Sequence, residues 1–290
     1  MDFHIIIPAH NEGAYLLQTL QSLVEQTFLP KKITIVNDGS TDGTQRIIDS
    51  FSEEYSFIKG IYHNLPIQQT GSEEAHAPGS KVINAFYRGL EANNDNFDII
   101  CKFDADLIFP TNYLEKIATI FESDPKIGMA GGFCYIEKSG QWVLENLTNK
   151  DHIRGALKAY RKACFKEIGG LKNAMGWDTV DELLAQYNGW KIKTDTSLHV
   201  KHLKHTGKVY TKAAKFKQGE AFYKLRYGFW LTFIASGKLA SRKRSLRFFM
   251  DCMKGYYKAK KDNLEFMVSK KEGEFIRKLR WQNILRKIGI

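Results

Sequence analysis

The sequence predicts an α/β fold of the Rossmann-like kind, with a mostly parallel sheet flanked by helices and a basic helical extension at the C-terminus. Two observations support this prediction. Short apolar segments alternate with amphipathic ones in the first half of the chain, a pattern that is typical of parallel α/β sheets. Beyond about residue 205, strand signals give way to basic, aromatic-rich sequence with helical periodicity.

The expected elements follow one another regularly along the first 130 residues. Strands at 3–7, 32–37, 57–62, 97–103 and 127–133 alternate with helices at 12–26, 42–54, 80–92 and 111–122. Each strand segment is a short, bulky run bounded by turn residues, as buried strands are. The first helix places Leu16, Leu20 and Leu23 on one face. Residues 64–79 are polar and without periodicity, which predicts a long loop of the kind that covers sites.

Composition indicates an intracellular globular protein. The chain has 290 residues, 43% of them hydrophobic, which is enough for a large core. The apolar run at its N-terminus lacks the basic lead and the length of a signal peptide. The four cysteines are far apart, so we expect buried apolar fillers rather than disulfides or a zinc site. A reducing, cytoplasmic location is expected from this.

Charge divides the chain in two. The net charge is +11, and residues 208–290 hold 22 Lys or Arg against 6 Asp or Glu, whereas residues 1–207 hold 21 against 26. We therefore expect a folded domain over 1–207 and a basic tail over 208–290. A basic tail of this kind favours nucleic acid or an anionic membrane surface as a partner.

The tail also has apolar stripes at helical spacing. Within 243–262 one helical stripe carries Leu246, Phe249, Met250, Met253 and Tyr257, and basic side chains fall on another stripe. The apolar run 227–235 is far shorter than the ~20 residues needed to cross a bilayer. These features predict peripheral attachment to the inner face of the membrane. The alternative, that the stripes pack on the folded domain, stays open.

Two carboxylates follow the fourth predicted strand. Asp104 and Asp106 are two residues apart, so an extended chain points both to the same side. In parallel sheets, ligands bind at the carboxyl ends of the strands. Oxygen ligands suit hard divalent cations such as Mn²⁺ or Mg²⁺. The pair therefore predicts a cation site, with a surface turn as the alternative.

Polar residues also follow the first two predicted strands. Glu12 comes after the first strand and Asp38 after the second, so both are expected at the same sheet edge as the Asp pair. Taken singly, Asp38 can begin a turn and Glu12 can favour a helix N-terminus. Their joint occurrence at three strand ends predicts one crevice.

Four motifs in this order resemble those of the inverting family 2 glycosyltransferases, which have the GT-A nucleotide-diphosphosugar transferase fold. They are IIIPAHNE at 5–12, VNDGSTDGT at 36–44, DAD at 104–106 and GWDTVDE at 176–182. The resemblance covers residues 3–207 and implies a nucleotide-sugar-binding half at 1–110 and an acceptor-binding half at 111–207. It implies a metal-dependent hexosyltransferase that uses a UDP-sugar, in cell-surface polysaccharide or glycolipid synthesis, with a glycan or lipid-linked acceptor.

The resemblance also assigns roles to single residues. Asp106 would hold the divalent cation against the diphosphate, and His202 matches a histidine that completes such metal sites. Lys204 would be a further phosphate contact. The nucleotide sugar would contact Pro8, Ala9, His10, Glu12, Asp38, Lys81, Asp104 and Ala105.

The base that deprotonates the acceptor hydroxyl is expected in the last motif. Asp178, Asp181 and Glu182 share a helical face at spacings of three and four. We favour Asp181, with Asp178 second. The sequence departs from the family pattern here, because Gln186 stands near the expected Arg, and this leaves the alignment open by three or four residues. Carboxylates that only favour the helix start are the alternative.

Other functions explain fewer of these residues. A nucleotidyltransferase of related fold would need a Gly-rich basic loop after the first strand, which PAHNEGAY at 8–15 is not. A nucleic-acid-binding protein would use the tail to follow phosphates. It would leave Asp38, Asp104 and Asp106 unexplained, since carboxylates repel a phosphate backbone. A sugar-nucleotide-binding protein without turnover would keep only the donor site.

Overall fold

The structure is a computed structural model that describes residues 1–62, 80–92, 96–145, 151–204 and 215–287. Its strands are β1 (Phe3–Ala9), β2 (Lys32–Asn37), β3 (Ile58–Tyr62), β4 (Ile99–Phe103), β5 (Leu107–Ile108), β6 (Ile127–Lys138), β7 (Gln141–Leu144), β8 (Leu157–Arg161) and β9 (Lys191–His202). Its helices are α1 (Leu16–Val24), α2 (Thr44–Glu54), α3 (Ser80–Glu91), α4 (Tyr113–Ser123), α5 (Lys162–Glu167), α6 (Trp177–Tyr187), α7 (Lys217–Lys224), α8 (Gly228–Lys243), α9 (Leu246–Lys261) and α10 (Lys270–Lys287).

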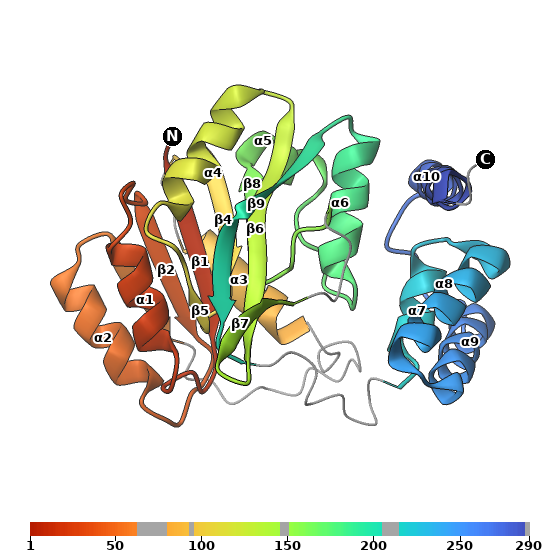
Figure 1. The fold of residues 1–290 in the computed structure, drawn as a ribbon, viewed down its shortest axis with the longest axis horizontal. Helices are drawn as coiled ribbons and strands as arrows, with labels where there is room; N and C mark the ends of the chain where they lie inside the picture. The colour runs from red at the N-terminus through yellow and green to blue at the C-terminus, as the bar shows by residue number, and fades with distance from the viewer. Residues whose placement is uncertain (63–79, 93–95, 146–150, 205–214, 288–290) are drawn as a thin grey trace.

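All nine strands form one sheet in the order β3-β2-β1-β4-β8-β6-β9-β5, with β7 paired to β6 (Figure 1). The first four strands in this order run parallel, as predicted. The second half is mixed, because β8 runs antiparallel to both β4 and β6, whereas β6 and β9 are parallel. The sheet is therefore parallel where the donor motifs lie and mixed beyond β4.

The alternating segments of the sequence become the expected elements. Strands β1, β2, β3, β4 and β6 and helices α1 to α4 all occur where they were predicted, within a few residues. The main difference is that α1 begins at Leu16 rather than at residue 12. Asn11 adopts a φ of 54°, and its side-chain oxygen accepts a hydrogen bond from Thr41 N at 2.8 Å. This contact holds residues 10–15 as a loop instead of a first helical turn. The predicted loop over 64–79 lies outside the described residues.

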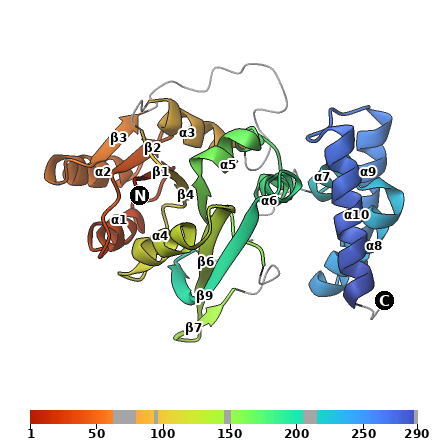
Figure 2. The same ribbon diagram turned by 90° about the horizontal axis from the view of Figure 1, so that it is seen from above.

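Two layers of helices enclose the sheet. Figure 2 shows α1 and α4 on one face and α3 and α5 on the other. The central strands are apolar on both sides, with Ile5, Ile6 and Ile7 fully buried in β1. All five residues of β4 are buried as well, including Lys102 at 2% exposure. Burial on both faces is the usual state of parallel strands in α/β folds.

The C-terminal segment is helical, as predicted. Helices α7 to α10 gather beyond α6, away from α1 and α2 (Figures 1 and 2). The ring of Phe275 in α10 lies 5.5 Å from that of Tyr187 in α6, and Ile276 beside it is fully buried. The predicted boundary near residue 207 falls between the described residues 204 and 215, so the division at 207 stays a proposal, as does the division at 110.

Two further predictions can be compared with the structure. All four cysteines are free and buried, which confirms their role as apolar fillers. Among the described helices, none combines the length and apolar character required to cross a bilayer.

Helices α7 and α9 cross with their backbones in contact. A Cβ atom on Gly219 would lie 1.8 Å from the carbonyl oxygen of Cys252, and one on Gly255 would lie 2.1 Å from that of Phe216. Carbonyl oxygens cannot give way as a side chain can. A side chain at either position would therefore clash with the backbone of the partner helix. The close crossing that the two glycines allow packs α7 against α9 within the tail.

We expect Gly219→Ala and Gly255→Ala each to lower the free energy of unfolding by about 1–3 kcal/mol, because the added methyl group separates α7 from α9. Urea titration followed by circular dichroism measures this. Gly237→Ala in α8 is the matched control, since a Cβ there meets no atom within 4 Å. The control should gain up to about 1 kcal/mol from helix propensity. Equal effects at all three positions would contradict the close crossing.

Candidate functional site

The loops after β1 and β2 are bonded into one unit. Ala9 is the register partner of Asn37 at the carboxyl ends of these strands, and Asp38 N donates to Ala9 O at 2.8 Å. Asn11 N donates to Ser40 Oγ at 2.9 Å. The polar residues after both strands thus lie side by side, as the sequence predicted.

Asp38 lies in this unit with two basic neighbours. Its carboxylate forms an ion pair with Arg88 of α3, and Nδ1 of His10 lies 2.7 Å from its carbonyl oxygen. The sequence analysis missed Arg88. Its position in the last turn of α3, a helix that packs over β1 and β2, places it above this edge.

Asp104 and Asp106 take different partners. Asp104, partly exposed, pairs with the buried Lys102 of β4, whereas Asp106 is 6% exposed and its Oδ2 lies 3.4 Å from His202 Nε2. His202 ends β9 and is the register partner of Leu107. The antiparallel pairing of β5 with β9 therefore brings His202 to the Asp pair, although His202 follows both aspartates by 96 residues or more in the sequence.

Glu12 shows that the acidic residues form one cluster. Burial raises the pKa of Glu12, and the negative charges of Asp106 and Asp104 raise it further, while the ion pair with Lys204 opposes this. Charges of one sign affect one another in this way only at short range. Three carboxylates from the ends of β1 and β4 thus share one small region, where a bound cation would reduce their repulsion.

His202 lies between two carboxylates. Its Nδ1 is 3.3 Å from Glu145 Oε2, on the side opposite Asp106. Burial by itself would lower the pKa of His202, but hydrogen bonding to Asp106 and Glu145 raises it to about 9. Arg154 donates to Glu145 Oε2 at 2.6 Å and so holds Glu145 in place.

Two sets of side chains here have the chemistry to hold a metal ion. Cys134, Glu145 and His202 are all buried, with ligand atoms within 4.8 Å of one another. Burial, however, raises the pKa of the Cys134 thiol to about 12, and a protonated thiol is a poor ligand. Glu145 is also held by Arg154. Asp106 with His202 offers an oxygen and a nitrogen ligand instead, provided that the cation displaces the proton from His202 Nε2, and Glu145 then orients the imidazole through Nδ1.

The remaining predicted donor residues lie around the cluster. Pro8 and Ala9 end β1, and Ala105 is buried with its carbonyl oxygen bonded to Thr19 Oγ1 at 2.9 Å. Lys81 is exposed on the first turn of α3. Within the described part of the chain, no hydrogen bond or ion pair joins Lys81 to the carboxylates. Its role in donor binding stays a prediction.

A second cluster of charged residues lies at the start of α6. Asp181 is completely buried, and both of its oxygens accept from Lys158 Nζ, at 2.8 and 2.9 Å. Tyr160 OH donates to its Oδ2 at 2.5 Å. Burial raises the pKa of Asp181 to about 6, although the charge of Lys158 opposes the shift. The carboxylate that the sequence favoured as base thus has its oxygens bonded to β8 inside the core.

Glu182 and Asp178 differ in accessibility. Glu182 is buried and accepts from Ile153 N at 2.9 Å, with His152 Nδ1 also at 2.9 Å. Burial would raise the pKa of Glu182, but Lys158 and His152 lower it overall. The side chain of Asp178 is 35% exposed and lies 3.8 Å from His152 Nε2. Of the three candidate bases, Asp178 is the one that a substrate can reach.

Two buried lysines connect the clusters. Lys102 of β4 and Lys158 of β8 are register partners, and the ring of Trp177 lies 5.4 Å from the first ammonium and 5.9 Å from the second. Lys102 forms an ion pair with Asp104 on the donor side, and Lys158 forms an ion pair with Asp181 on the α6 side. The sequence analysis missed both. A lysine inside an otherwise apolar strand, as in IICKF at 99–103, is the signal that was available.

Comparison with known proteins assigns the chain. The sequence profile of Glycosyl transferase family 2 matches residues 4–66. The Probable glycosyltransferase YdaM of Bacillus subtilis is 28% identical over 212 residues, which are 63% of this chain and 44% of YdaM. These matches and the shared fold support the assignment of the chain to glycosyl transferase family 2. It spans about half the length of the first curated relatives that it matches.

Solved structures show the same fold at low sequence identity. TarS 1-349 of S. aureus, in complex with UDP-GlcNAc, matches with a TM-score of 0.57 and 16% identity, over 83% of this chain and 67% of TarS 1-349. The mannosyltransferase PcManGT of Pyrobaculum calidifontis, in complex with GDP-Man and Mn²⁺, matches with a TM-score of 0.55 and 13% identity, over 97% of this chain and 80% of PcManGT. The fold is GT-A, as the motifs implied.

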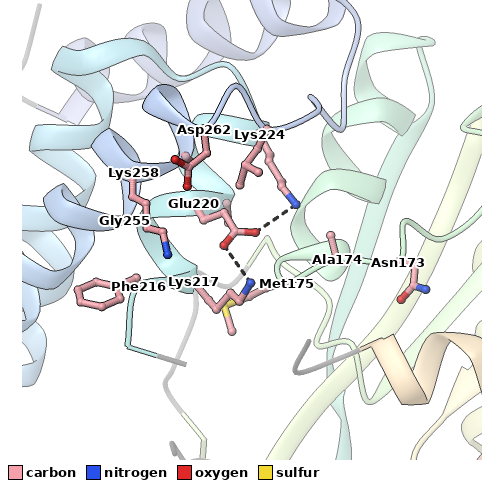
Figure 3. A pocket seen from close by; sticks show the side chains of 13 residues that line it. Asn173, Ala174, Met175, Phe216, Lys217, Glu220, Lys224, Gly255, Lys258 and Asp262 are labelled. Atoms are coloured by element: carbon pink, nitrogen blue, oxygen red, sulfur yellow. Dashed lines mark hydrogen bonds and ion pairs between the residues drawn. The ribbon is translucent and has the colours of Figure 1, made fainter. Parts of the chain in front are cut away.

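A pocket lies between the segment just before α6 and helices α7 and α9. It has a volume of about 280 Å³ and is lined by residues 173–175, just before α6, and by α7 and α9. Figure 3 shows Lys217 and Lys224 on either side of Glu220, with ion pairs of 3.0 and 3.1 Å. None of the residues that line the pocket belongs to the carboxylate cluster, so the two are separate.

The ion pairs of His152 predict a pH dependence of stability. Burial would lower the pKa of His152, but its bonds to Asp178 and Glu182 raise it to about 9. A histidine whose pKa is raised by folding stabilises the protein fully below pH 6.5 and loses this effect as the pH rises through 9. We expect the free energy of unfolding to fall by up to about 3 kcal/mol over this window. Urea titrations at pH 6 and pH 9.5 measure it.

The variant His152→Gln should remove about half of the pH dependence and lower stability at pH 6, because the pKa of His202 is also raised to about 9 and His202 contributes the other half. Exposed His199 gives the control, because His199→Gln should keep the slope of the unmodified protein. A slope unchanged by His152→Gln would show that other groups cause it.

Proposed function

We propose that the protein is an inverting glycosyltransferase that moves a sugar from a nucleotide diphosphate donor, a UDP-sugar, to an acceptor hydroxyl. The observation that supports this most directly is the convergence of Glu12, Asp106 and His202 at the carboxyl edge of the sheet, where His202 contacts Asp106 and the neighbouring Lys204 pairs with Glu12. The complexes of TarS with UDP-GlcNAc and of PcManGT with GDP-Man support a nucleotide-sugar donor in this fold.

On the donor side, each polar residue has a partner that limits its motion. Asp38 is held by Arg88, and Asp104 by Lys102, so both carboxylates are pre-positioned to accept hydrogen bonds from a base or a ribose. Lys204, paired with Glu12, follows Leu203, whose N donates to Asp106 O at 2.9 Å, and would be a further contact for the diphosphate. Such preorganisation lowers the entropic cost of binding.

Asp106 and His202 would hold the divalent cation, Mn²⁺ or Mg²⁺. When bound, the cation stabilises the negative charge that develops on the leaving diphosphate. Glu145 would keep the His202 ring in place through Nδ1 and leave Nε2 directed at the site. The complex of PcManGT contains Mn²⁺, which supports this choice of ion.

We assign the base to Asp178. Burial would raise the pKa of Asp178, but hydrogen bonding to His152 and the charge of Lys158 lower it overall, so the carboxylate is ionised at neutral pH. Its side chain is partly exposed at the first turn of α6, the most exposed of the three candidates, and an acceptor hydroxyl would approach there. Asp181 and Glu182 instead join α6 to Lys158 and hold Asp178 in position.

The acceptor would be a glycan or a lipid-linked sugar, in cell-surface polysaccharide or glycolipid synthesis. The pocket between residues 173–175 and α7 is lined by residues three to five positions before Asp178, and it would take the part of the acceptor beyond the reacting hydroxyl. A cytoplasmic enzyme at the inner face of the membrane would meet such acceptors.

The cation site predicts that Asp106→Asn lowers donor turnover by at least about 100-fold, because one of the groups that hold the cation is weakened. Donor hydrolysis is measured across a panel of nucleotide sugars with Mn²⁺ and with a chelator, and Mn²⁺ affinity is measured by calorimetry. Asp98→Asn is the control, since Asp98 precedes β4 at the opposite sheet edge. Turnover that persists in the chelator and in Asp106→Asn would disprove the metal-dependent mechanism.

The assignment of the base predicts a different pattern for Asp178→Asn and Asp181→Asn. Asp178→Asn should lower transfer by about 10²- to 10⁴-fold while donor affinity and folding persist, because only proton removal is lost. Asp181→Asn should lower the free energy of unfolding by about 3 kcal/mol, because Lys158 stays buried without its partner.

Transfer assays, donor calorimetry and urea titration on the same preparations separate the two outcomes. Should Asp178→Asn transfer sugar at the normal rate while a folded Asp181→Asn does not, the base is Asp181.

A further inference from the structure

Helices α8 and α9 expose large apolar side chains that no described residue covers. We call this set the aromatic ridge. It consists of Phe229, Trp230, Phe233, Ile234, Leu246, Met250 and Tyr257, all exposed by more than a third. Trp230 is 67% exposed and Leu246 is 77% exposed, the two largest fractions among the exposed large apolar residues.

The ridge is continuous across both helices. The ring of Phe229 lies 5.1 Å from that of Trp230 and 6.4 Å from that of Tyr257 in α9. Phe233 contacts Phe249 at 5.2 Å and so joins the helices a second time. Contiguous exposed apolar surface of this kind marks an interaction site rather than chance exposure.

Packing within the protein does not account for the ridge. The same helices bury another face, on which Leu231 and Ala240 of α8 and Cys252, Met253 and Ala259 of α9 lie. Packing of α9 on α7 and α8 thus explains the burial of Met253, and packing on the main core explains that of Ile276 in α10. These contacts leave Trp230 and Leu246 in solvent, so each helix of the pair has a second apolar face.

The charge around the ridge is almost entirely positive. Together α8 and α9 contain eight Lys or Arg and one acidic residue, Asp251, which is buried and 3.5 Å from Lys215. Arg247 and Lys254 are exposed on α9, one position after Leu246 and four after Met250. The connection between the helices adds a ninth basic residue, Arg244. A partner of this surface is therefore apolar at its centre and anionic around it.

An anionic lipid bilayer has this combination. Aromatic rings favour the interface between headgroups and acyl chains, and basic residues near anionic headgroups contribute about 1 kcal/mol each. Nucleic acid fits less well, because Leu246 and Met250 are aliphatic and give bases no ring to stack on. We propose that the α8–α9 face docks on an anionic bilayer with the aromatic ridge in the headgroup region.

This proposal goes beyond sugar transfer and is independent of it. Lipid binding is measured without donor or acceptor, so a failure of the proposed chemistry leaves it intact. If both hold, the tail keeps the family 2 domain next to lipid-linked acceptors.

The test is flotation of the full chain with vesicles of phosphatidylcholine alone and with 30% phosphatidylglycerol. We expect binding to the anionic vesicles that weakens at high salt. Trp230→Ser with Leu246→Ser should reduce the partition coefficient at least about tenfold, and Arg247→Gln with Lys254→Gln should do so for anionic vesicles. Circular dichroism confirms that each variant is folded.

Matched controls change side chains of the same kind on the family 2 domain. Leu17→Ser with Leu29→Ser removes two leucines that are 50% and 52% exposed, and Lys59→Gln with Lys166→Gln removes two exposed charges. Both controls should float as the unmodified protein does. Equal recovery of the unmodified protein in the soluble fraction with and without anionic vesicles would overturn the proposal. So would a dimer, seen by light scattering, that Trp230→Ser with Leu246→Ser dissociates, since the ridge would then join two copies.

Discussion

The buried ammonium of Lys158 is the group on which the arrangement of the α6 cluster depends. It bonds both oxygens of Asp181, one oxygen of Glu182 and the carbonyl oxygen of Asp178, with no exposure to solvent. Removing one member of such a group leaves an unpaired buried charge, which is strongly destabilising. The first turn of α6 is therefore fixed to β8 by electrostatics as well as by packing, and Asp178 inherits its position from this attachment.

The donor edge is built on the opposite principle, because its negative charges are only partly compensated. Arg88, Lys102 and Lys204 each pair with one carboxylate, yet Glu12 keeps a raised pKa beside Asp104 and Asp106. The free energy of folding keeps these like charges close together, and their repulsion lowers the stability of the protein. A bound cation would reduce this repulsion. The interactions of Lys158 thus stabilise the fold, whereas the repulsion at the carboxylate edge destabilises it, as is common where proteins bind charged ligands.

The alternation of apolar runs and turns predicted β1, β2 and β4, and with them the edge where Asp38, Asp104 and Asp106 lie. It did not predict β8, because Lys158 interrupts a five-residue strand whose partner charge lies 23 residues on. The sequence analysis did not predict strand β9 for another reason, since the first seven residues of β9 are mostly exposed and polar. The choice between Asp178 and Asp181 was equally beyond the sequence. Helical spacing places both near one face, and only the position of β8 decides which one is buried.

The tail shows the same limit of periodicity in a different form. The predicted stripe on α9 included Met250 and Met253, three residues apart, yet the structure exposes the first and buries the second. A period of 3.6 residues identifies one apolar face, whereas a helix between a protein core and an apolar partner needs two. Charge separates the two faces where hydrophobicity does not. Basic side chains adjoin Leu246 and Met250, and the buried face of α9 holds Asp251 paired with Lys215. The exposed face is therefore distinguished by the partner it can attract, and not by its apolar content alone.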